Sequence, residues 1–490
     1  MTRFLPWKII GYQLYLFQLE EYEDERFLKS LFSKGLFPIK DLRKNLVLTN
    51  KVKLNLAIAL VIKLAISIAL AYLASPFFNI SSTFTYILLC IAFFYVTDIF
   101  HFAFAIQAAW ITSPFEDIAK KRMIKQAKNK LGKFKNIKII GITGSYGKTS
   151  MKEVLKTVLS ERFKVVATKG NNNTPLGVAR TIINNVTDNT EILIIEVGEY
   201  KKGDVAEICT IAPPHISIIT GINEAHLERY GSMENAISTK FEITEITQPN
   251  PAIYLNADDE LTKQNYKRLI AKDLEVNFFS ARNDDLSEIK AKDIFFDTKK
   301  PGISFSLKHN ATEIENINTN FISEYIIGYS AACTLIALQL GMTASEIKFA
   351  LGQIKPFEHR LEAKINPNNI LIIDDTYNGN SNGIKEGISI LKKFKDRRKV
   401  YVTPGLVETG AVAEPIHNEI GKWLASVVDL VILTKNSVTP FIFDGLVKAG
   451  FDKSKIVWYY SSKETYEKLR EHLQPNDVVL MQNDWSDNYV

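Results

Sequence analysis

The chain has 490 residues, enough for about three domains of ordinary size. Its three cysteines, Cys90, Cys209 and Cys333, are far apart, so the sequence excludes both a disulfide framework and a cysteine-rich metal site. The net charge of +6 is mild and does not by itself indicate a nucleic-acid-binding protein.

The first 50 residues contain many aromatic side chains mixed with charged ones. Examples are Trp7, Tyr12, Tyr15 and Phe27. This composition is typical of helices that lie at an interface or pack against another domain. We therefore predict that residues 1–50 form N-terminal helices on the cytoplasmic side of a membrane.

Two long apolar stretches follow, Leu54–Phe78 and Thr83–Val96, and the second extends to Trp110 if two ionisable residues are tolerated. A helix needs about 20 apolar residues to cross a bilayer. We therefore predict that residues 51–112 form a two-helix transmembrane hairpin. The alternative that the sequence leaves open is a buried helical hairpin in a soluble protein.

Basic residues flank the predicted hairpin on both sides, whereas the short linker around Asn79 and Ser81 carries no charge. By the positive-inside rule, both flanks and therefore both chain termini are cytoplasmic. The second flank is a predicted basic linker helix at residues 113–132. A run of nine basic residues starts within this helix and continues beyond it: Lys120, Lys121, Arg122, Lys125, Lys128, Lys130, Lys133, Lys135 and Lys138.

Lys63 and Asp98 test the hairpin prediction. Both lie about 26 Å from a turn near residue 80, at the helical rise of about 1.5 Å per residue. We expect the two side chains to face one another and form an ion pair, with His101 one turn from Asp98.

A phosphate-binding turn is predicted at Thr143–Ser150, between a strand at Ile137–Ile140 and a helix with Val154, Leu155, Val158 and Leu159 on one face. Backbone N–H groups at such a helix N-terminus bind phosphate oxygens. Lys148 adds a positive charge, and Thr149 offers a hydroxyl to Mg²⁺. The predicted nucleotide-binding residues here are Gly144, Ser145, Gly147, Lys148, Thr149 and Ser150.

Two further predicted strands lead into segments that carry an acidic or a histidine side chain. Ile192–Ile195 runs into Glu196, and Ile216–Ile219 leads to His226. Ligands of open α/β sheets bind at the carboxyl ends of the strands. A carboxylate and a neutral imidazole in this position can hold Mg²⁺ against phosphates.

These residues carry a resemblance to the Mur ligase family, whose members form amide bonds with ATP in the synthesis of peptidoglycan precursors. The similarity is greatest to the branch that adds D-alanyl-D-alanine to a UDP-linked muramoyl tripeptide. The motifs, in chain order, are Thr143–Thr149, Ile195–Gly198, Asn223–Glu228, Ser238–Glu242, Leu255–Asp259, His359–Glu362 and Asp374–Asn380.

The resemblance implies the roles of individual residues. Lys148 would bind phosphate, Thr149 and Glu196 would hold one Mg²⁺, and His226 would help to hold the second. Lys240 matches the lysine that the family carbamylates, which would turn a cation into an anion that supports Mg²⁺. The predicted catalytic residues are accordingly Lys148, Lys240 and His226. The predicted metal ligands are Thr149, Glu196, His226 and, as a carbamate, Lys240.

The resemblance also implies nucleotide contacts further along the chain. Asn256 matches a position that contacts adenine, while Arg360 and Asp375 match residues that bring the C-terminal domain onto the nucleotide. The expected fold is α/β. A central ATP-binding domain at 133–355 precedes a Rossmann-like C-terminal domain at 356–490.

The departures from the branch concern its substrates. The membrane hairpin stands where a soluble UDP-binding domain is usual, Thr220-Gly221 replaces Thr-Asn, and Gly379-Asn380-Ser381 replaces Ala-Asn-Pro. The segment Met481–Trp485 also lacks the Lys-Gly-Ser-Arg ending expected in that branch. The ATP-binding motifs are intact, so the sequence favours a retained reaction with changed substrates.

The sequence therefore predicts a membrane-anchored, ATP- and Mg²⁺-dependent ligase that faces the cytoplasm. Its acyl substrate would be a muropeptide, UDP- or lipid-linked, its amine donor an amino acid or dipeptide, and nucleic acid is not expected as a partner. The alternatives are a ligase of the cyanophycin or folylpolyglutamate type and a nucleotide-binding membrane scaffold without turnover.

Overall fold

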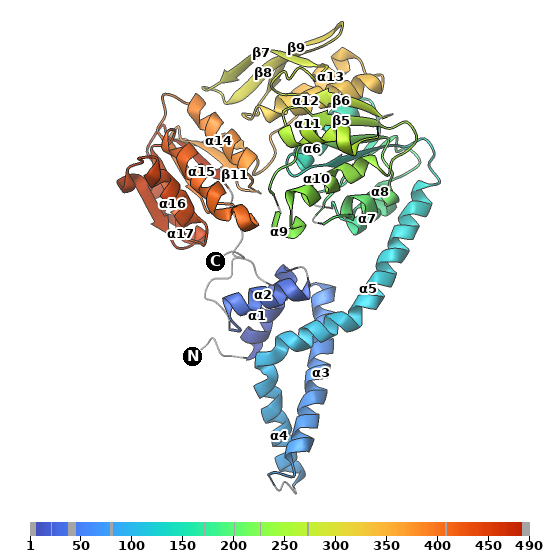
Figure 1. Ribbon diagram of the computed structural model, residues 1–490, viewed down its shortest axis with the longest axis vertical. Helices are drawn as coiled ribbons and strands as arrows, with labels where there is room; N and C mark the ends of the chain where they lie inside the picture. Colours follow the sequence, from blue (N-terminus) through green and yellow to red (C-terminus); the bar gives the residue numbers. More distant parts are fainter. Residues whose placement is uncertain are drawn as a thin grey trace. The chain divides into compact units, whose positions relative to one another are not determined.

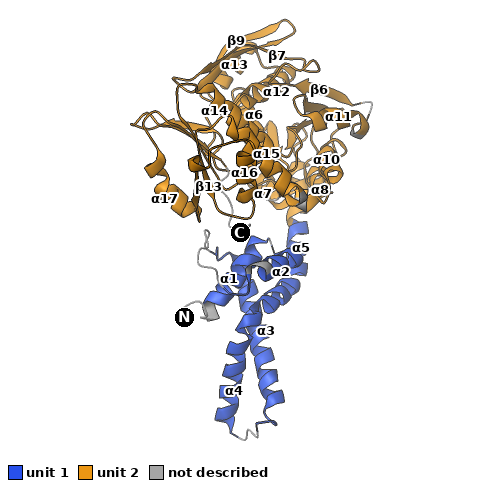
Figure 2. Cartoon of the chain, turned by 60° about the vertical axis from the view of Figure 1, so that its left-hand side comes forward, with its two compact units in different colours: residues 1–122 blue, residues 123–490 orange. Residues whose placement is uncertain are grey.

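The computed structural model describes residues 6–20, 22–37, 46–78, 82–170, 172–199, 201–225, 227–271, 274–377, 379–406 and 409–482. The chain forms two compact units, residues 1–122 and residues 123–490 (Figure 2). The predicted uncharged turn falls on residues 79–81, outside the described residues.

The first unit is entirely helical over the residues described. Its helices are α1 Pro6–Leu19, α2 Asp24–Lys34, α3 Asn50–Ala74, α4 Thr83–Val96 and the first two-thirds of α5, His101–Leu131. Helices α3 and α4 run side by side as a hairpin (Figure 1). Aromatic residues of α1 and α2, including Tyr12, Phe17 and Phe27, form a small core with Ala105 and Ile106 of α5.

The hairpin contains the predicted ion pair. Lys63 of α3 is fully buried, and its ammonium contacts the Asp98 carboxylate and lies 3.8 Å from the centre of the Phe94 ring. His101 is buried one turn further along the chain. The prediction that Lys63 and Asp98 face one another is confirmed.

The second apolar stretch continues past Asp98 but not as one straight helix. Helix α4 ends at Val96, and a 3₁₀ turn at Thr97–Phe100 leads into α5. Helix α5 then packs antiparallel to the first half of α3. Ala108 lies beside Ala59, Thr112 Oγ1 donates a hydrogen bond of 3.2 Å to Asn55 Oδ1, and Lys51 pairs with Glu116 at 2.8 Å.

By length and composition, α3 and the helical stretch Thr83–Leu131 are each apolar enough to cross a membrane. The buried side of α3 repeats every three or four residues, which is the spacing of one helix face. The opposite side exposes large apolar side chains such as Val61, Leu64, Ile68 and Tyr72.

The second unit begins with a parallel six-stranded sheet in the order β2-β3-β1-β4-β5-β6. Its strands are β1 Lys138–Thr143, β2 Val165–Ala167, β3 Ile192–Glu196, β4 Ile216–Ile219, β5 Ala252–Asn256 and β6 Glu275–Phe279. The helices of this part are α6 Lys148–Ser160, α7 Pro175–Asn185, α8 Asp204–Ile211, α9 Leu227–Tyr230, α10 Met233–Phe241, α11 Glu260–Leu269, α12 Tyr325–Gln339 and α13 Ala344–Gly352.

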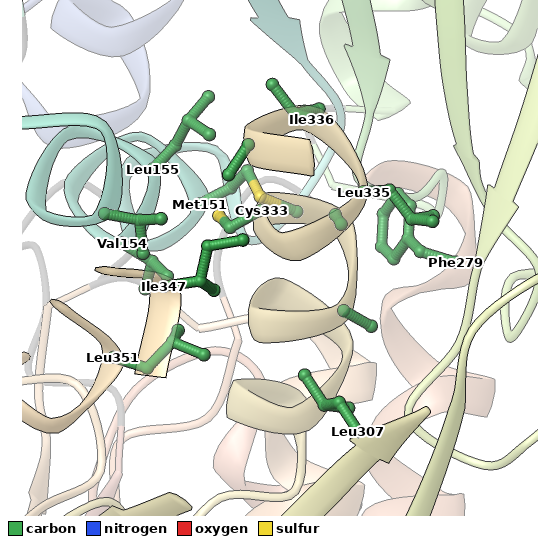
Figure 3. Close-up of a cluster of buried hydrophobic side chains, with 14 of the residues drawn as sticks. Met151, Val154, Leu155, Phe279, Leu307, Cys333, Leu335, Ile336, Ile347 and Leu351 are labelled. Carbon is green, nitrogen blue, oxygen red and sulfur yellow. The ribbon is translucent and has the colours of Figure 1, made fainter. Parts of the chain in front are cut away.

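Helix α6 carries the expected apolar face into the core. Val154, Leu155, Val158 and Leu159 are fully buried. Figure 3 shows Met151, Val154 and Leu155 beside Cys333 and Ile336 of α12 and Ile347 and Leu351 of α13. This packing fixes the start of α6, and therefore the phosphate-binding turn, at the end of β1.

A small antiparallel sheet, β7-β8-β9, follows the large one. Its strands are β7 Lys290–Asp297, β8 Gly302–His309 and β9 Thr312–Thr319. The inward residues of β8 and β9, such as Phe305 and Ile317, join the same core as α12.

The C-terminal part is a second six-stranded sheet in the order β10-β11-β15-β12-β13-β14, parallel except for the edge strand β10. Its strands are β10 Glu362–Ile365, β11 Leu371–Asp375, β12 Lys399–Thr403, β13 Leu430–Thr434, β14 Ile456–Tyr459 and β15 Val478–Gln482. Helices α14 Ser381–Lys393, α15 Ala413–Ala425, α16 Thr439–Lys448 and α17 Ser462–His472 alternate with these strands. The α/β architecture of both parts agrees with the sequence prediction.

Candidate functional site

The turn between β1 and α6 has the backbone that a phosphate-binding loop requires. Gly144 and Gly147 adopt positive φ angles of 142° and 77°. A Cβ atom on Gly144 would lie 2.2 Å from Thr220 Oγ1, and one on Gly147 would lie 2.5 Å from the Tyr329 hydroxyl. Only glycine fits both positions without displacing these side chains.

The second half of the turn is tied to the loop after β4. The backbone N–H of Ser145 donates to Gly221 O at 2.8 Å, and Ser145 Oγ accepts from the Asn223 N–H at 3.1 Å. Thr220 donates its hydroxyl to the carbonyl of Tyr146. The loops at the ends of β1 and β4 therefore form one hydrogen-bonded rim.

Lys148 and Thr149, the first two residues of α6, contact acidic residues at the end of β3 and just beyond it. Thr149 Oγ1 donates to Glu196 Oε1 at 3.1 Å, and Lys148 Nζ lies 3.4 Å from Glu199 Oε1. Lys148 also donates to the carbonyl of Gly144. A P-loop lysine, a hydroxyl and a carboxylate are thus gathered at the carboxyl edge of the sheet.

Glu196 is held from a second side by Lys152, a residue that the sequence analysis did not single out. Lys152 is fully buried, and its ammonium lies 3.2 Å from Glu196 Oε2 and 3.3 Å from Gly170 O. Asn173 Nδ2 also approaches Glu196 Oε1, at 3.4 Å. The sequence signal that could have identified Lys152 is its spacing, because it lies four residues after Lys148 and therefore on the same face of α6.

Lys240 points into the same region from α10. Its Nζ donates to the Tyr230 hydroxyl at 2.7 Å and lies 3.5 Å from Glu199 Oε1. Burial lowers the pKa of the Lys240 ammonium to about 8, against the opposing effect of Glu199. Lys148 and Lys240 therefore both approach Glu199, while Thr149 connects the start of α6 to Glu196.

His226 is a predicted metal ligand and catalytic residue, but it lies outside the described residues. Asn256, the predicted adenine contact, is 7% exposed at the end of β5. Its side chain donates to Thr220 O at 2.8 Å and accepts from the Asp258 N–H at 3.0 Å. In this structure Asn256 therefore braces the loop after β4.

Arg360 and Asp375 reach the phosphate-binding turn from the C-terminal part. They line a cavity of about 90 Å³ together with Tyr146, Gly147 and Ser150. The Arg360 guanidinium stacks 4.2 Å from the centre of the Tyr377 ring. Its neighbours His359 and Leu361 have left-handed φ angles of 59° and 50°, a conformation that is rare for leucine.

Asp375 ends β11 and is mostly enclosed. Burial raises the pKa of its carboxyl to about 6, although a hydrogen bond of 2.7 Å from Gln482 Nε2 and the nearby Arg360 oppose the shift. Gln482 also accepts from the Tyr401 hydroxyl at 2.9 Å. Gln482 belongs to the C-terminal segment that departs from the family pattern, and here it holds a predicted nucleotide contact.

The donor set fits a nucleotide-bound Mg²⁺. Mg²⁺ at such sites takes one or two carboxylates, with phosphate oxygens and water filling the remaining positions. Thr149 and Glu196 provide a neighbouring hydroxyl and carboxylate at the start of α6. Within the described ranges, no three acidic, histidine or cysteine side chains are grouped as a preformed cage, so the phosphates would have to contribute ligands.

Comparisons with known proteins agree with this geometry. The model of the Mur ligase middle domain matches residues 142–337, and that of the Mur ligase glutamate ligase domain matches residues 359–482. UDP-N-acetylmuramoyl-tripeptide–D-alanyl-D-alanine ligase of Mycobacterium bovis is 27% identical over 70% of this chain and 69% of its own. The enzyme of the same name from Bacillus subtilis is 25% identical over 70% of this chain and 72% of its own.

Solved structures show the same fold. The MurF ligase of Thermotoga maritima in complex with ADP is 26% identical, with a TM-score of 0.64 over 74% of this chain and 80% of that one. MurF of Acinetobacter baumannii, 22% identical, gives a TM-score of 0.65 over 74% of this chain and 77% of that one.

A phosphate-binding turn at the edge of a parallel sheet, facing a second α/β domain across a cavity, defines a nucleotide-dependent enzyme of two catalytic domains. The chain belongs to the Mur ligase family. It is accordingly an ATP-dependent, ADP-forming amide-bond ligase.

Proposed function

We propose that this ligase joins an amino acid or dipeptide to the carboxyl group of a cell-wall muropeptide at the cytoplasmic face of a membrane. The observation that carries the proposal is the meeting of Lys148, Thr149 and Glu196 at one end of the sheet, with Arg360 and Asp375 on the wall of an adjoining cavity. The names of the similar enzymes support a muropeptide acceptor and a dipeptide such as D-alanyl-D-alanine.

The proposed reaction has two chemical steps. The acceptor carboxylate attacks the γ-phosphorus of ATP, ADP leaves, and an acyl phosphate forms. The amine then attacks the acyl carbon, loses a proton, and phosphate leaves as the amide bond forms. Phosphoryl transfer of this kind depends mainly on positioning and charge neutralisation.

The residues of the turn suit that need. Lys148 and the backbone N–H groups at the start of α6 would bind the phosphates, and Thr149 with Glu196 would hold Mg²⁺, which neutralises phosphate charge. Asp375, and Arg360 in its stack on Tyr377, would bring the C-terminal domain onto the nucleotide. The predicted roles of Asn256 as an adenine contact and of His226 as a ligand remain predictions.

Membrane attachment through the α3–α4 hairpin is the second part of the proposal. The outward faces of both helices carry large apolar side chains, including Leu64, Ile68, Ile87, Leu88 and Ile91. Ionisable residues within such a hairpin are tolerated when they pair with one another, and Lys63 pairs with Asp98. The family models match from residue 142 onward, so a hairpin at 51–112 would occupy the place of a UDP-binding domain.

The carrier of the acceptor, UDP or a lipid, is tested together with the reaction. Purified full-length protein in detergent receives ATP, pools of amino acids and dipeptides, and either UDP-linked or lipid-linked muropeptide, and ADP release is measured. We expect release that needs both an acceptor and an amine. Tight ATP binding without turnover in any combination would instead favour a nucleotide-binding scaffold or an untested substrate.

Two variants sharpen this experiment. Lys148→Ala should abolish ADP release while the thermal unfolding temperature stays within a few degrees of the wild type, because the Lys148 side chain is only partly buried. Lys156→Ala, at an exposed lysine two turns later on the same helix, is the matched control and should retain activity.

Extraction of membranes with alkaline carbonate tests the hairpin: release of the intact chain into the supernatant would contradict a transmembrane attachment.

A further inference from the structure

Helix α5 presents one exposed face whose character changes from apolar to basic along its length. The helix spans His101–Leu131 without a break and so belongs to both compact units (Figure 2). Ile111, Phe115 and Ile118 are 50%, 71% and 48% exposed, and their spacing of four and three residues places them on one side of the helix. Arg122 follows Ile118 by four residues, so it continues the same side, and it is also exposed.

The basic end of this face has no acidic neighbours along the chain. Lys121 and Lys125 flank Arg122, and both are exposed. Residues 118–138 include no aspartate or glutamate. The buried side of the helix is formed here by apolar residues such as Ala127, which pack into the core of the second unit. The three cations therefore face solvent and are placed to attract an anionic partner.

The contacts of α5 with α3 set the level of its apolar side chains. Lys51, in the first turn of α3, pairs with Glu116 at 2.8 Å. Phe115 and Ile118, on either side of Glu116 in the sequence, therefore lie level with the start of α3, just before the apolar stretch that begins at Leu54. In a membrane-embedded hairpin this level is the boundary between acyl chains and headgroups, where amphipathic helices bury aromatic and aliphatic side chains.

A groove at the other end of this face suits an acyl chain. It has a volume of about 430 Å³ and is lined by Ile62, Gln107, Trp110 and Ile111. Arg122 lies about 16 Å further along the helix, at the helical rise of about 1.5 Å per residue. The long stems of arginine and lysine cover apolar surface while their charges bend back towards headgroups. A lipid with an acyl chain in the groove therefore directs its phosphate towards these cations.

We propose that this face of α5 is a docking surface for anionic phospholipids. The acyl chains lie against the exposed apolar side chains, and the headgroup phosphate is bound by Lys121, Arg122 and Lys125. The inference rests on the proposed membrane attachment, but it does not depend on which substrates the ligase joins. The apolar contacts hold any phospholipid, whereas the cations select a headgroup with a net negative charge.

Native mass spectrometry tests this selection by counting the lipids that the protein retains. Full-length protein in detergent receives equal amounts of phosphatidylglycerol and phosphatidylcholine with the same acyl chains; both carry a phosphate, but only phosphatidylglycerol has a net charge. We expect the wild type to prefer phosphatidylglycerol by at least about 10-fold, because each cation near an anionic lipid contributes about 5-fold. Combining Lys121→Gln, Arg122→Gln and Lys125→Gln should reduce the preference to within about 2-fold.

Two further variants separate charge from apolar contact. Lys133→Gln, Lys135→Gln and Lys156→Gln together remove the same number of exposed charges elsewhere in the chain, and this matched control should keep the preference. Phe115→Ser with Ile118→Ser should lower the retention of both lipids and leave their ratio unchanged, because apolar burial does not distinguish headgroups.

The salt dependence of the wild type tests the same point without a variant. Raising the salt from about 0.1 M to about 1 M shortens the screening length from about 10 Å to about 3 Å and should weaken the preference for phosphatidylglycerol. This measurement stands even if a variant fails to fold.

The outcomes separate the docking surface from the membrane attachment. Equal retention of the two lipids by the wild type, or a preference that survives in the triple variant of the α5 cations, would overturn the docking surface. A dimer mass that Phe115→Ser with Ile118→Ser abolishes, without bound phosphatidylglycerol, would place a second copy of the chain on this face instead. Release of the chain by alkaline carbonate would overturn the attachment itself, whereas a chain that resists extraction and shows no lipid preference would overturn only the docking surface.

Discussion

The pairing of Lys152 with Glu196 makes a strong prediction about stability. The Lys152 side chain is fully buried, that of Glu196 is 3% exposed, and the charged atoms are 3.2 Å apart. Removing one partner of such a buried pair usually costs about 3–5 kcal/mol, because the remaining charge is left without compensation. Lys152→Met should therefore lower the free energy of unfolding of the central domain by about 3–5 kcal/mol.

The appropriate assay is a double-mutant cycle. Lys152→Met, Glu196→Gln and the combined variant are unfolded in urea and followed by circular dichroism. Tryptophan fluorescence is unsuitable because the central domain, residues 133–355, contains no tryptophan. With the buried charge neutralised, the combined variant should recover much of the loss seen in Lys152→Met, since a neutral pair of similar volume is tolerated.

Strictly additive effects in this cycle would refute the reasoning. They would mean that Lys152 and Glu196 do not depend on one another energetically, and that Lys152 serves mainly through its contacts with Gly170 O and Glu153. Lys156→Met on the exposed side of α6 is the control and should change the free energy of unfolding by less than about 0.5 kcal/mol.

Three further predictions follow from individual contacts. Because burial raises the pKa of Asp375 to about 6, the charged carboxylate destabilises the folded protein above pH 6, and that stability returns as the pH falls towards 4. In urea unfolding, Asp375→Asn should therefore stabilise the protein by up to about 3 kcal/mol at pH 8 and by far less at pH 4. A gain in stability that does not depend on pH would contradict this prediction. Gly221→Ala should lower the free energy of unfolding by about 1–3 kcal/mol, because the φ of Gly221 is 149° and the new Cβ would lie 2.2 Å from the Tyr146 hydroxyl. Adding Tyr146→Ala should remove this clash. Equal thermal stability of Gly221→Ala and the wild type would show that no clash exists. Lys63→Met should sharply reduce the yield of monodisperse protein in detergent, because it leaves the buried Asp98 carboxylate without its partner. Combining Lys63→Met with Asp98→Leu should restore the yield. Equal yields for the single and double variants would show that the two residues are not coupled.

The close approach of Gly221 and Tyr146 also explains one departure from the family pattern. The Tyr146 hydroxyl donates to Asp259 Oδ2 at 3.0 Å, and the same oxygen accepts the Ile222 N–H at 3.0 Å. The tyrosine ring thus occupies the space above Gly221 in which an asparagine side chain would lie. The replacement of asparagine by glycine at this position accommodates a large residue in the phosphate-binding turn.

Much of the architecture was predictable from local sequence. Buried strands such as Ile192–Ile195 and the apolar face of α6 follow from the spacing of apolar residues, which depends only on the periods of strand and helix. The turn at Thr143–Ser150 was predictable because its glycines, lysine and threonine lie together in the chain. The Lys63–Asp98 pair was predictable because helical rise sets their depths relative to one turn.

Contacts between distant segments were decided only by the tertiary structure. Glu199 lies in the sequence Glu-Tyr-Lys-Lys-Gly, which has the composition of a solvated loop, and its burial results from the packing of Lys148 and Lys240 on either side. Asn256 braces a loop because β5 ends beside Thr220. The sequence by itself thus determined the elements and the phosphate-binding chemistry, because these depend on neighbours in the chain. Which charges compensate one another was decided by the fold, since pairing depends on distances that no local pattern records.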